Sequence, residues 1–100
     1  MHTFRLQSIV ITYRNEQTTL LFTSAELVVV TEYGDRLWYI DVNGVEQKEL
    51  LEQFAHSEDI RVEITSETDQ GQILSGVAYL HPNPAHRAAA LRGDGVLLGL

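Results

Sequence analysis

Residues 26–42 read ELVVVTEYGDRLWYIDV, and this stretch decides the class of fold that we expect. Two runs rich in β-branched and aromatic residues flank the segment 33–36, whose glycine and aspartate are typical turn residues. Two such runs joined by a short turn predict a β-hairpin. The alternation along the second run predicts that Trp38 and Tyr39 point to opposite faces, so that one ring joins the core and the other faces solvent, a partner or a ligand.

Further strand patterns lie on both sides of this hairpin. They cover residues 4–14, 18–23, 59–67 and 72–81. In the first of these runs the alternation slips at Gln7 and Ser8, which predicts a bulge or a bend. We expect turns at Asn15 and Glu16 and at residues 69–71, where turn-forming residues separate the runs. The chain is therefore expected to be mostly antiparallel sheet.

One segment after the hairpin carries the pattern of an amphipathic helix. Its apolar residues recur at helical spacing and are Leu50, Leu51, Phe54 and Ala55. Asn43 is a suitable N-cap residue, and Glu46 follows three positions later, as in a capping box. These features predict a helix over about 45–56.

The segment HPNPAHRAAALRGDG, residues 81–95, allows two structures. A proline near the start, alanines in the middle and a glycine past the end are typical of a short helix, here over about 84–92. The alternative is a loop followed by a strand over 86–92 that turns at Asp94 and Gly95 into residues 96–100. In either case we expect an α+β fold, with a mainly antiparallel, strongly bent sheet or partial β-barrel of about six strands.

Composition limits the class of protein. One hundred residues suffice for a single domain, 1–100, with one modest core. The absence of cysteine excludes disulfides and thiolate metal sites and favours a reducing compartment. The N-terminal residues do not form a signal peptide, and no apolar run approaches the length that crosses a bilayer. We therefore expect a soluble, cytoplasmic protein that does not bind membranes.

The net charge of −7 comes entirely from residues 41–69. This window holds nine acidic residues and only two basic ones, Lys48 and Arg61, whereas the flanking segments are neutral. Binding to nucleic acid requires a basic stripe, and none is present. The window predicts an acidic face, which either serves solubility alone or attracts a protein partner. The candidate partner-binding residues are Glu46, Glu49, Glu52, Glu58, Asp59, Trp38 and Tyr39.

The polar residues of the C-terminal segment are the candidates for ligand binding. They are His81, Asn83 and His86. Two histidines five positions apart have no standard metal-ligand spacing on a helix or a strand, so we expect neither a metal nor another cofactor. No glycine-flanked nucleophile and no phosphate-binding loop is present, so no catalytic residue is predicted.

These observations favour a small, non-enzymatic binding or assembly module with an acidic face for a protein partner. Two alternatives remain open. One is a barrel with a ligand pocket, a carrier or an enzyme that uses a histidine, and the other is an acidic inhibitor that imitates nucleic acid. Residues 9–11 and 27–30 are apolar on both strand faces, which predicts self-association as a homodimer.

Overall fold

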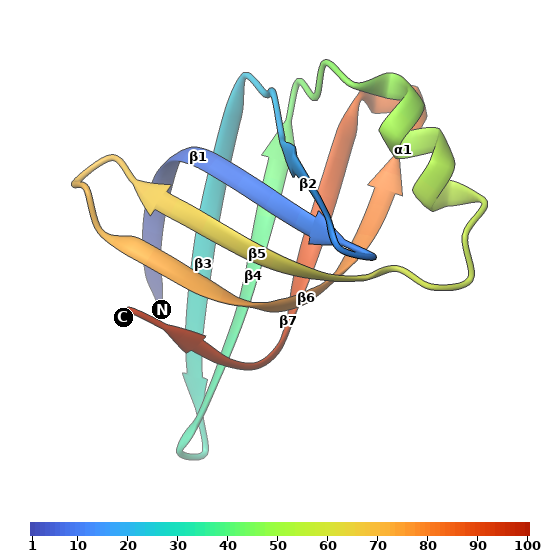
Figure 1. The fold of residues 1–100 in the computed structure, drawn as a ribbon. Coiled ribbons are helices and arrows are strands. Elements are labelled where there is room, and N and C mark those ends of the chain that lie inside the picture. The colour runs from blue at the N-terminus through green and yellow to red at the C-terminus, as the bar shows by residue number, and fades with distance from the viewer.

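The computed structural model describes residues 1–100, which form seven β-strands, one α-helix and one 3-10 turn (Figure 1). In chain order the elements are β1 (His2–Tyr13), β2 (Glu16–Thr19), β3 (Ser24–Glu32), β4 (Asp35–Asn43), α1 (Lys48–Ala55), β5 (Arg61–Thr68), β6 (Ile73–Asn83), η1 (Pro84–His86) and β7 (Ala88–Leu98). Neither helical element has the length and apolar character that would be needed to span a membrane.

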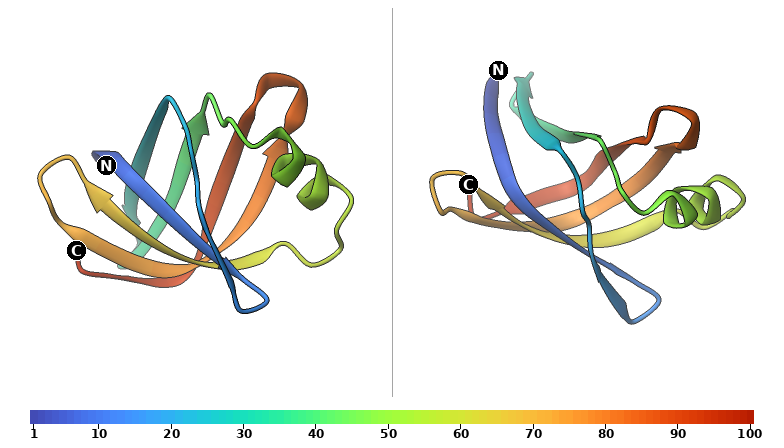
Figure 2. Two further views of the ribbon diagram at one scale, coloured as in Figure 1. Left: turned by 45° about the horizontal axis from the view of Figure 1, so that its top comes forward. Right: turned by 90° about the horizontal axis from the view of Figure 1, so that it is seen from above.

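Six of the strands close into an antiparallel barrel. The order around the barrel is β1, β3, β4, β7, β6 and β5, and β5 pairs again with β1. β2 lies outside this circle and pairs only with the second half of β1. Figure 2 shows the curved wall of strands, with α1 beside one end of it. The predicted bent, mainly antiparallel sheet with one amphipathic helix is therefore confirmed.

β1 carries the predicted irregularity, and its bend closes the barrel. The register of β1 against β5 shifts between Leu6 and Ser8, where a bulge had been expected. A bulge bends a strand and increases its twist, so the two halves of β1 can belong to different parts of the wall. Residues 2–5 pair with β3, and residues 10–13 pair with β2.

The predicted hairpin is formed by β3 and β4. Their ladder runs without interruption from Ser24 opposite Asn43 to Glu32 opposite Asp35. Tyr33 and Gly34 both have positive φ, 52° and 83°, as a two-residue type I′ turn requires.

The barrel interior is filled by apolar side chains. Twenty-one buried residues form one cluster, to which α1 contributes Leu51 and Phe54. Leu27 and Val29 point into this cluster, whereas the intervening Val28 lies outside it. Val28 is nevertheless only 5% exposed. The outward apolar face of β3 that suggested a homodimer is therefore partly covered within one chain.

The segment 84–92 is not a helix, so this prediction is wrong. The 3-10 turn η1 ends at His86 and is followed by Arg87, which is left-handed with φ 48°. The alternative strand is confirmed from Ala88 onward, but β7 continues through Asp94 and Gly95 without the expected hairpin turn. Alanine prefers helices by only some tenths of a kcal/mol per residue over most other residues. β7 pairs on one side with β4 and on the other with β6, and it buries Ala89 and Leu91, which outweighs that preference.

The predicted start of the first helix is also wrong. α1 begins at Lys48 rather than near 45, and the Asn43–Glu46 capping box does not form. Asn43 is held in β4, where it pairs with strands on both sides. The cap position belongs to Gln47, whose side chain accepts from Leu21 N and donates to the carbonyl of Thr19. That amide ties the helix to the segment after β2.

Two buried hydroxyl groups of β5 differ in their hydrogen bonds, so we expect their removal to change the free energy of unfolding differently. Ser66 Oγ has no hydrogen-bond partner, whereas Thr68 Oγ1 accepts from the backbone of Gln70 at 3.3 Å and of Gln72 at 3.1 Å. Ser66→Ala removes an unsatisfied polar atom and should leave the unfolding free energy unchanged or raise it by about 1 kcal/mol. Thr68→Val, which leaves two amides unpaired, should lower it by about 1–2 kcal/mol. Urea denaturation measures both; a larger loss for Ser66→Ala would contradict this assignment.

Candidate functional site

The candidate site lies on the outer surface of the barrel wall, across β4, β7, β6 and β5. Register places Tyr39 of β4 opposite Arg92 of β7, and Arg92 opposite Tyr79 of β6. Tyr79 in turn lies opposite Arg61 of β5. Directly opposite residues share a face, with Cβ atoms about 4.5–5.5 Å apart. We call Tyr39, Arg92, Tyr79 and Arg61 the Tyr–Arg row.

The alternation of each strand turns this row outward. The neighbours of Tyr39 in sequence, Trp38 and Ile40, are both buried, and so are those of Tyr79. Leu91, which precedes Arg92, is fully buried. Because four hydrogen-bonded strands hold the row, its side chains start from a rigid backbone.

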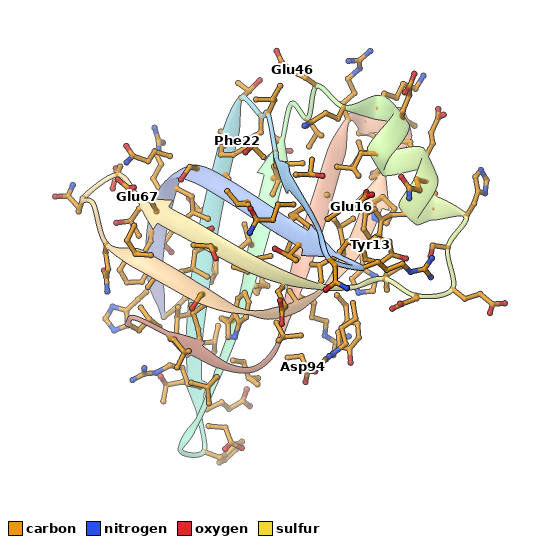
Figure 3. All side chains as sticks on the ribbon, viewed as in Figure 1. Tyr13, Glu16, Phe22, Glu46, Glu67 and Asp94 are labelled. Atoms are coloured by element: carbon orange, nitrogen blue, oxygen red, sulfur yellow. The ribbon has the colours of Figure 1, made fainter.

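The two arginines of the row differ in their electrostatic surroundings. Arg61 Nε lies 3.8 Å from Asp94 Oδ2, and the Tyr79 hydroxyl donates a long hydrogen bond of 3.4 Å to the same oxygen. Figure 3 shows Asp94 on the outside of the barrel. No carboxylate lies within 4.0 Å of the Arg92 guanidinium. Arg92 therefore has no ion pair within 4.0 Å and lies between two tyrosines.

The predicted ligand-binding residues lie at one end of the same wall. His81 and Asn83 stand opposite Ala90 and Ala88 of β7, and together with Asp41 they line a shallow groove of about 340 Å³. His86 Nδ1 lies 3.2 Å from Asn83 Oδ1. The structure thus brings these polar residues together with Tyr39 on one surface. It assembles no group of three side chains that could hold a metal ion.

The acidic residues do not form one cluster. Glu46 and Glu49 lie beside and on α1, and Glu58 lies in the loop that follows it. Glu52 is 3.9 Å from Lys48 on the same helix. Figure 3 shows Glu46 and Glu67 on well-separated parts of the molecule, so Glu67 lies apart from the acids at α1.

Asp59, one of the predicted partner-binding acids, is engaged within the chain. Its carbonyl accepts hydrogen bonds of 2.8 Å from Tyr13 Oη and from Ser57 Oγ. Its carboxylate lies 3.8 Å from Arg14. These contacts anchor the loop between α1 and β5 to the end of β1, which gives Asp59 a structural role.

The two aromatic candidates separate as the alternation predicts. Trp38 is 3% exposed and belongs to the core, whereas Tyr39 is 39% exposed on the outer wall. The indole N–H of Trp38 donates to the carbonyl of Gly95 at 3.0 Å. Tyr39 is therefore the aromatic side chain that a partner can reach.

Sequence reasoning missed three members of the row, Arg92, Tyr79 and Arg61. The alternative strand over 86–92 contained Arg92, but no pairing with β4 was predicted for that strand, so no register connected Arg92 with Tyr39. Arg61 and Tyr79 carried a usable signal, because each lies between apolar residues of a strand pattern and must face outward.

Function has to be inferred from the geometry of this chain. Its surface offers the Tyr–Arg row and a shallow polar groove, and its barrel interior is occupied by side chains. No protein-family model, no curated protein sequence and no solved structure matches this chain.

Proposed function

We propose that this protein is a non-enzymatic module that binds a partner protein through the Tyr–Arg row. The observation that carries this proposal is Arg92, an exposed guanidinium that forms no ion pair within 4.0 Å and lies between two tyrosines on the outer wall. Tyrosine and arginine are enriched among the residues that dominate binding energy at protein interfaces. The filled interior of the barrel supports a surface binder over a carrier or an enzyme with an enclosed pocket.

The chemistry of the row specifies the partner surface. Arg92 is suited to a carboxylate, which a guanidinium binds through two parallel hydrogen bonds. The rings of Tyr39 and Tyr79 on either side offer flat, amphipathic contact area. We therefore expect the partner to present an aspartate or a glutamate that is bordered by apolar side chains.

The test compares Arg92→Glu with Arg5→Glu. Both replace an exposed arginine that has no ion pair and change the net charge equally, but Arg5 lies on β1, away from the row. We expect a partner captured from native extract and then purified to bind Arg92→Glu roughly 30-fold more weakly or worse, as loss of a dominant interface residue implies. Arg5→Glu should bind it as the wild type does. Calorimetric titration measures both affinities.

Tyr39→Ala supplies a second, uncharged variant of the same surface. This variant should also bind the partner more weakly, and the far-ultraviolet circular dichroism spectrum of the barrel should stay unchanged. Equal affinities for the wild type, Arg92→Glu and Tyr39→Ala would exclude the row as the binding surface.

We also propose that the exposed acids near α1 speed the encounter with a basic region of a partner. Glu46, Glu49 and Glu58 are exposed and have no ion pair. Their effect is electrostatic and long-range, so it fades as salt shortens the screening length. In stopped-flow mixing with the same partner, replacing these three residues by glutamine should lower the association rate at low salt and not at high salt.

Self-association and location stay predictions. Sedimentation of the pure protein at micromolar concentration distinguishes a monomer of 11.3 kDa from a homodimer of twice that mass. The absence of cysteine supports action in a reducing compartment such as the cytoplasm.

A further inference from the structure

Three polar residues lie on the inner side of the barrel wall where β3 leads into β4. The register of the hairpin places Thr31 opposite Arg36, and that of β1 places His2 opposite Val29. Val29 is 3% exposed and belongs to the core cluster. Residues two apart on a strand share a face, as do residues directly opposite each other, so Thr31, Arg36 and His2 face inward with Val29. We call the inner side of this end of the barrel the mouth.

The mouth contains a small, open pocket. Its volume is about 270 Å³, close to the lower end of the range for small-ligand pockets. Its lining is half apolar, with Phe4, Val29 and Leu100, and half polar, with His2, Thr31 and Arg36. An apolar lining with a few convergent polar groups is typical of a ligand site, and such sites recur in the mouths of β-barrels.

The titratable groups of this pocket are all basic. They are Arg36 and His2, and no lining residue is acidic. No carboxylate group lies within 4.0 Å of either side chain. The acids of the hairpin tip, Glu32 and Asp35, stand opposite each other one position further along, where alternation turns them to the outer face. By charge complementarity the pocket therefore favours an anion.

We propose that the mouth binds an ionised carboxylate that is attached to a short apolar body. The guanidinium of Arg36 can hold a carboxylate through two parallel hydrogen bonds, and Thr31 on the neighbouring strand adds a hydroxyl donor. The apolar half of the lining accepts the hydrocarbon body, whose removal from water is favourable. This site is independent of the Tyr–Arg row, which lies on the outer face of the wall.

Titration with sodium hexanoate tests the proposal. The measurement is made at about 0.15 M salt, where the screening length of about 8 Å weakens repulsion by the acids of residues 41–69. We expect saturable binding in the millimolar range, which a ligand of so few atoms can reach. Amide chemical-shift changes should centre on residues 2–4, 29–31 and 36. No saturable binding, or shift changes centred on the Tyr–Arg row, would overturn the proposal.

Two control ligands separate the charge from the apolar body. Hexanamide has the same body without the charge, and acetate has the charge without the body. Each should bind roughly tenfold more weakly than hexanoate, because each lacks one of the two interactions. Equal binding of hexanamide would contradict a role for Arg36, and equal binding of acetate would contradict a role for the apolar lining.

A third ligand distinguishes two sources of the same chemistry. A free short-chain acid carries a carboxylate on an apolar body, and so does a protein chain that ends in an apolar residue. Acetyl-Gly-Gly-Leu with a free carboxylate represents the chain end. If it binds more tightly than hexanoate, the site takes chain ends; if it binds more weakly, the site takes free acids. Either result supports the proposal, whereas binding of neither ligand contradicts it.

Matched variants locate the carboxylate on the protein. Arg36→Gln should bind hexanoate roughly tenfold more weakly, as loss of a charged hydrogen-bond partner implies. Arg5→Gln and Arg92→Gln change the net charge equally, but neither residue lines the pocket, so both should bind hexanoate within about twofold of the wild type. Equal affinities of Arg36→Gln and Arg5→Gln would overturn the assignment. Loss of binding in Arg92→Gln alone would assign the carboxylate to the Tyr–Arg row instead.

A second pair of variants tests the apolar lining. Leu100 lines the pocket, whereas Leu98, two positions earlier and 62% exposed, does not. Leu100→Ser should weaken hexanoate at least threefold, and Leu98→Ser should leave its affinity unchanged. Both side chains are exposed, so both variants should keep the wild-type circular dichroism spectrum. Equal effects of the two changes would contradict the proposed position of the hydrocarbon body.

Discussion

Replacing Trp38 by alanine should lower the free energy of unfolding by about 3–5 kcal/mol, the usual cost of emptying a buried aromatic site. The indole is 3% exposed, and it packs against the inward-facing glycines Gly76 and Gly93 of β6 and β7. Its removal leaves a cavity that the surrounding backbone cannot fill, and it frees the carbonyl of Gly95. Guanidinium denaturation followed by far-ultraviolet circular dichroism measures the loss.

Tyr39→Ala is the matched control for this variant. Tyr39 is the next residue on the same strand, but it lies on the outer wall. Tyr39→Ala should lower the free energy of unfolding by well under half as much as Trp38→Ala does. Similar losses of unfolding free energy at the two positions would contradict a core role for the indole of Trp38.

Gly93→Ala should lower the free energy of unfolding by about 2–3 kcal/mol, because the added methyl group overpacks a rigid interior. A Cβ atom on Gly93 would overlap the five-membered ring of Trp38, with 2.5 Å to Nε1. The φ of Gly93 is not positive, so the backbone itself accepts alanine and the expected cost is steric. Chemical denaturation measures it.

Two comparisons isolate this steric cause. Gly95→Ala meets no atom within 4 Å, and its expected cost of about 1–2 kcal/mol comes from its left-handed φ of 79°. Combining Gly93→Ala with Trp38→Phe should cost at least about 1 kcal/mol less than the sum of the single changes, because the smaller ring makes room for the methyl group. Strict additivity would contradict direct contact between the two residues.

The sequence alone determined the local elements. The hairpin of β3 and β4, the bulge in β1 and the placement of Trp38 and Tyr39 on opposite faces follow from period-two alternation and turn chemistry. Each of these signals is contained within a few neighbouring residues, so no distant contact is needed to read it.

Local preference misled where tertiary pairing was stronger. The alanines of 84–92 favour a helix by a small free energy per residue, but two flanking strands and the burial of Leu91 hold them in β7. Asn43 is a good helix cap, yet the ladders of β4 already hold it. In both cases the competing partner lies far away in the sequence.

Only the tertiary structure decided the candidate surfaces. The sequence predicted that one of Trp38 and Tyr39 is exposed, but not which one. The position of Tyr39 beside Arg92 depends on the register of strands separated by some fifty residues. The irregular register between β6 and β7, and the end of the β4–β7 ladder at Tyr39 and Arg92, also depend on pairing between distant strands. Alternation specifies which face of a strand a side chain occupies, whereas its neighbours across the sheet are set by long-range pairing and by the closure of the barrel.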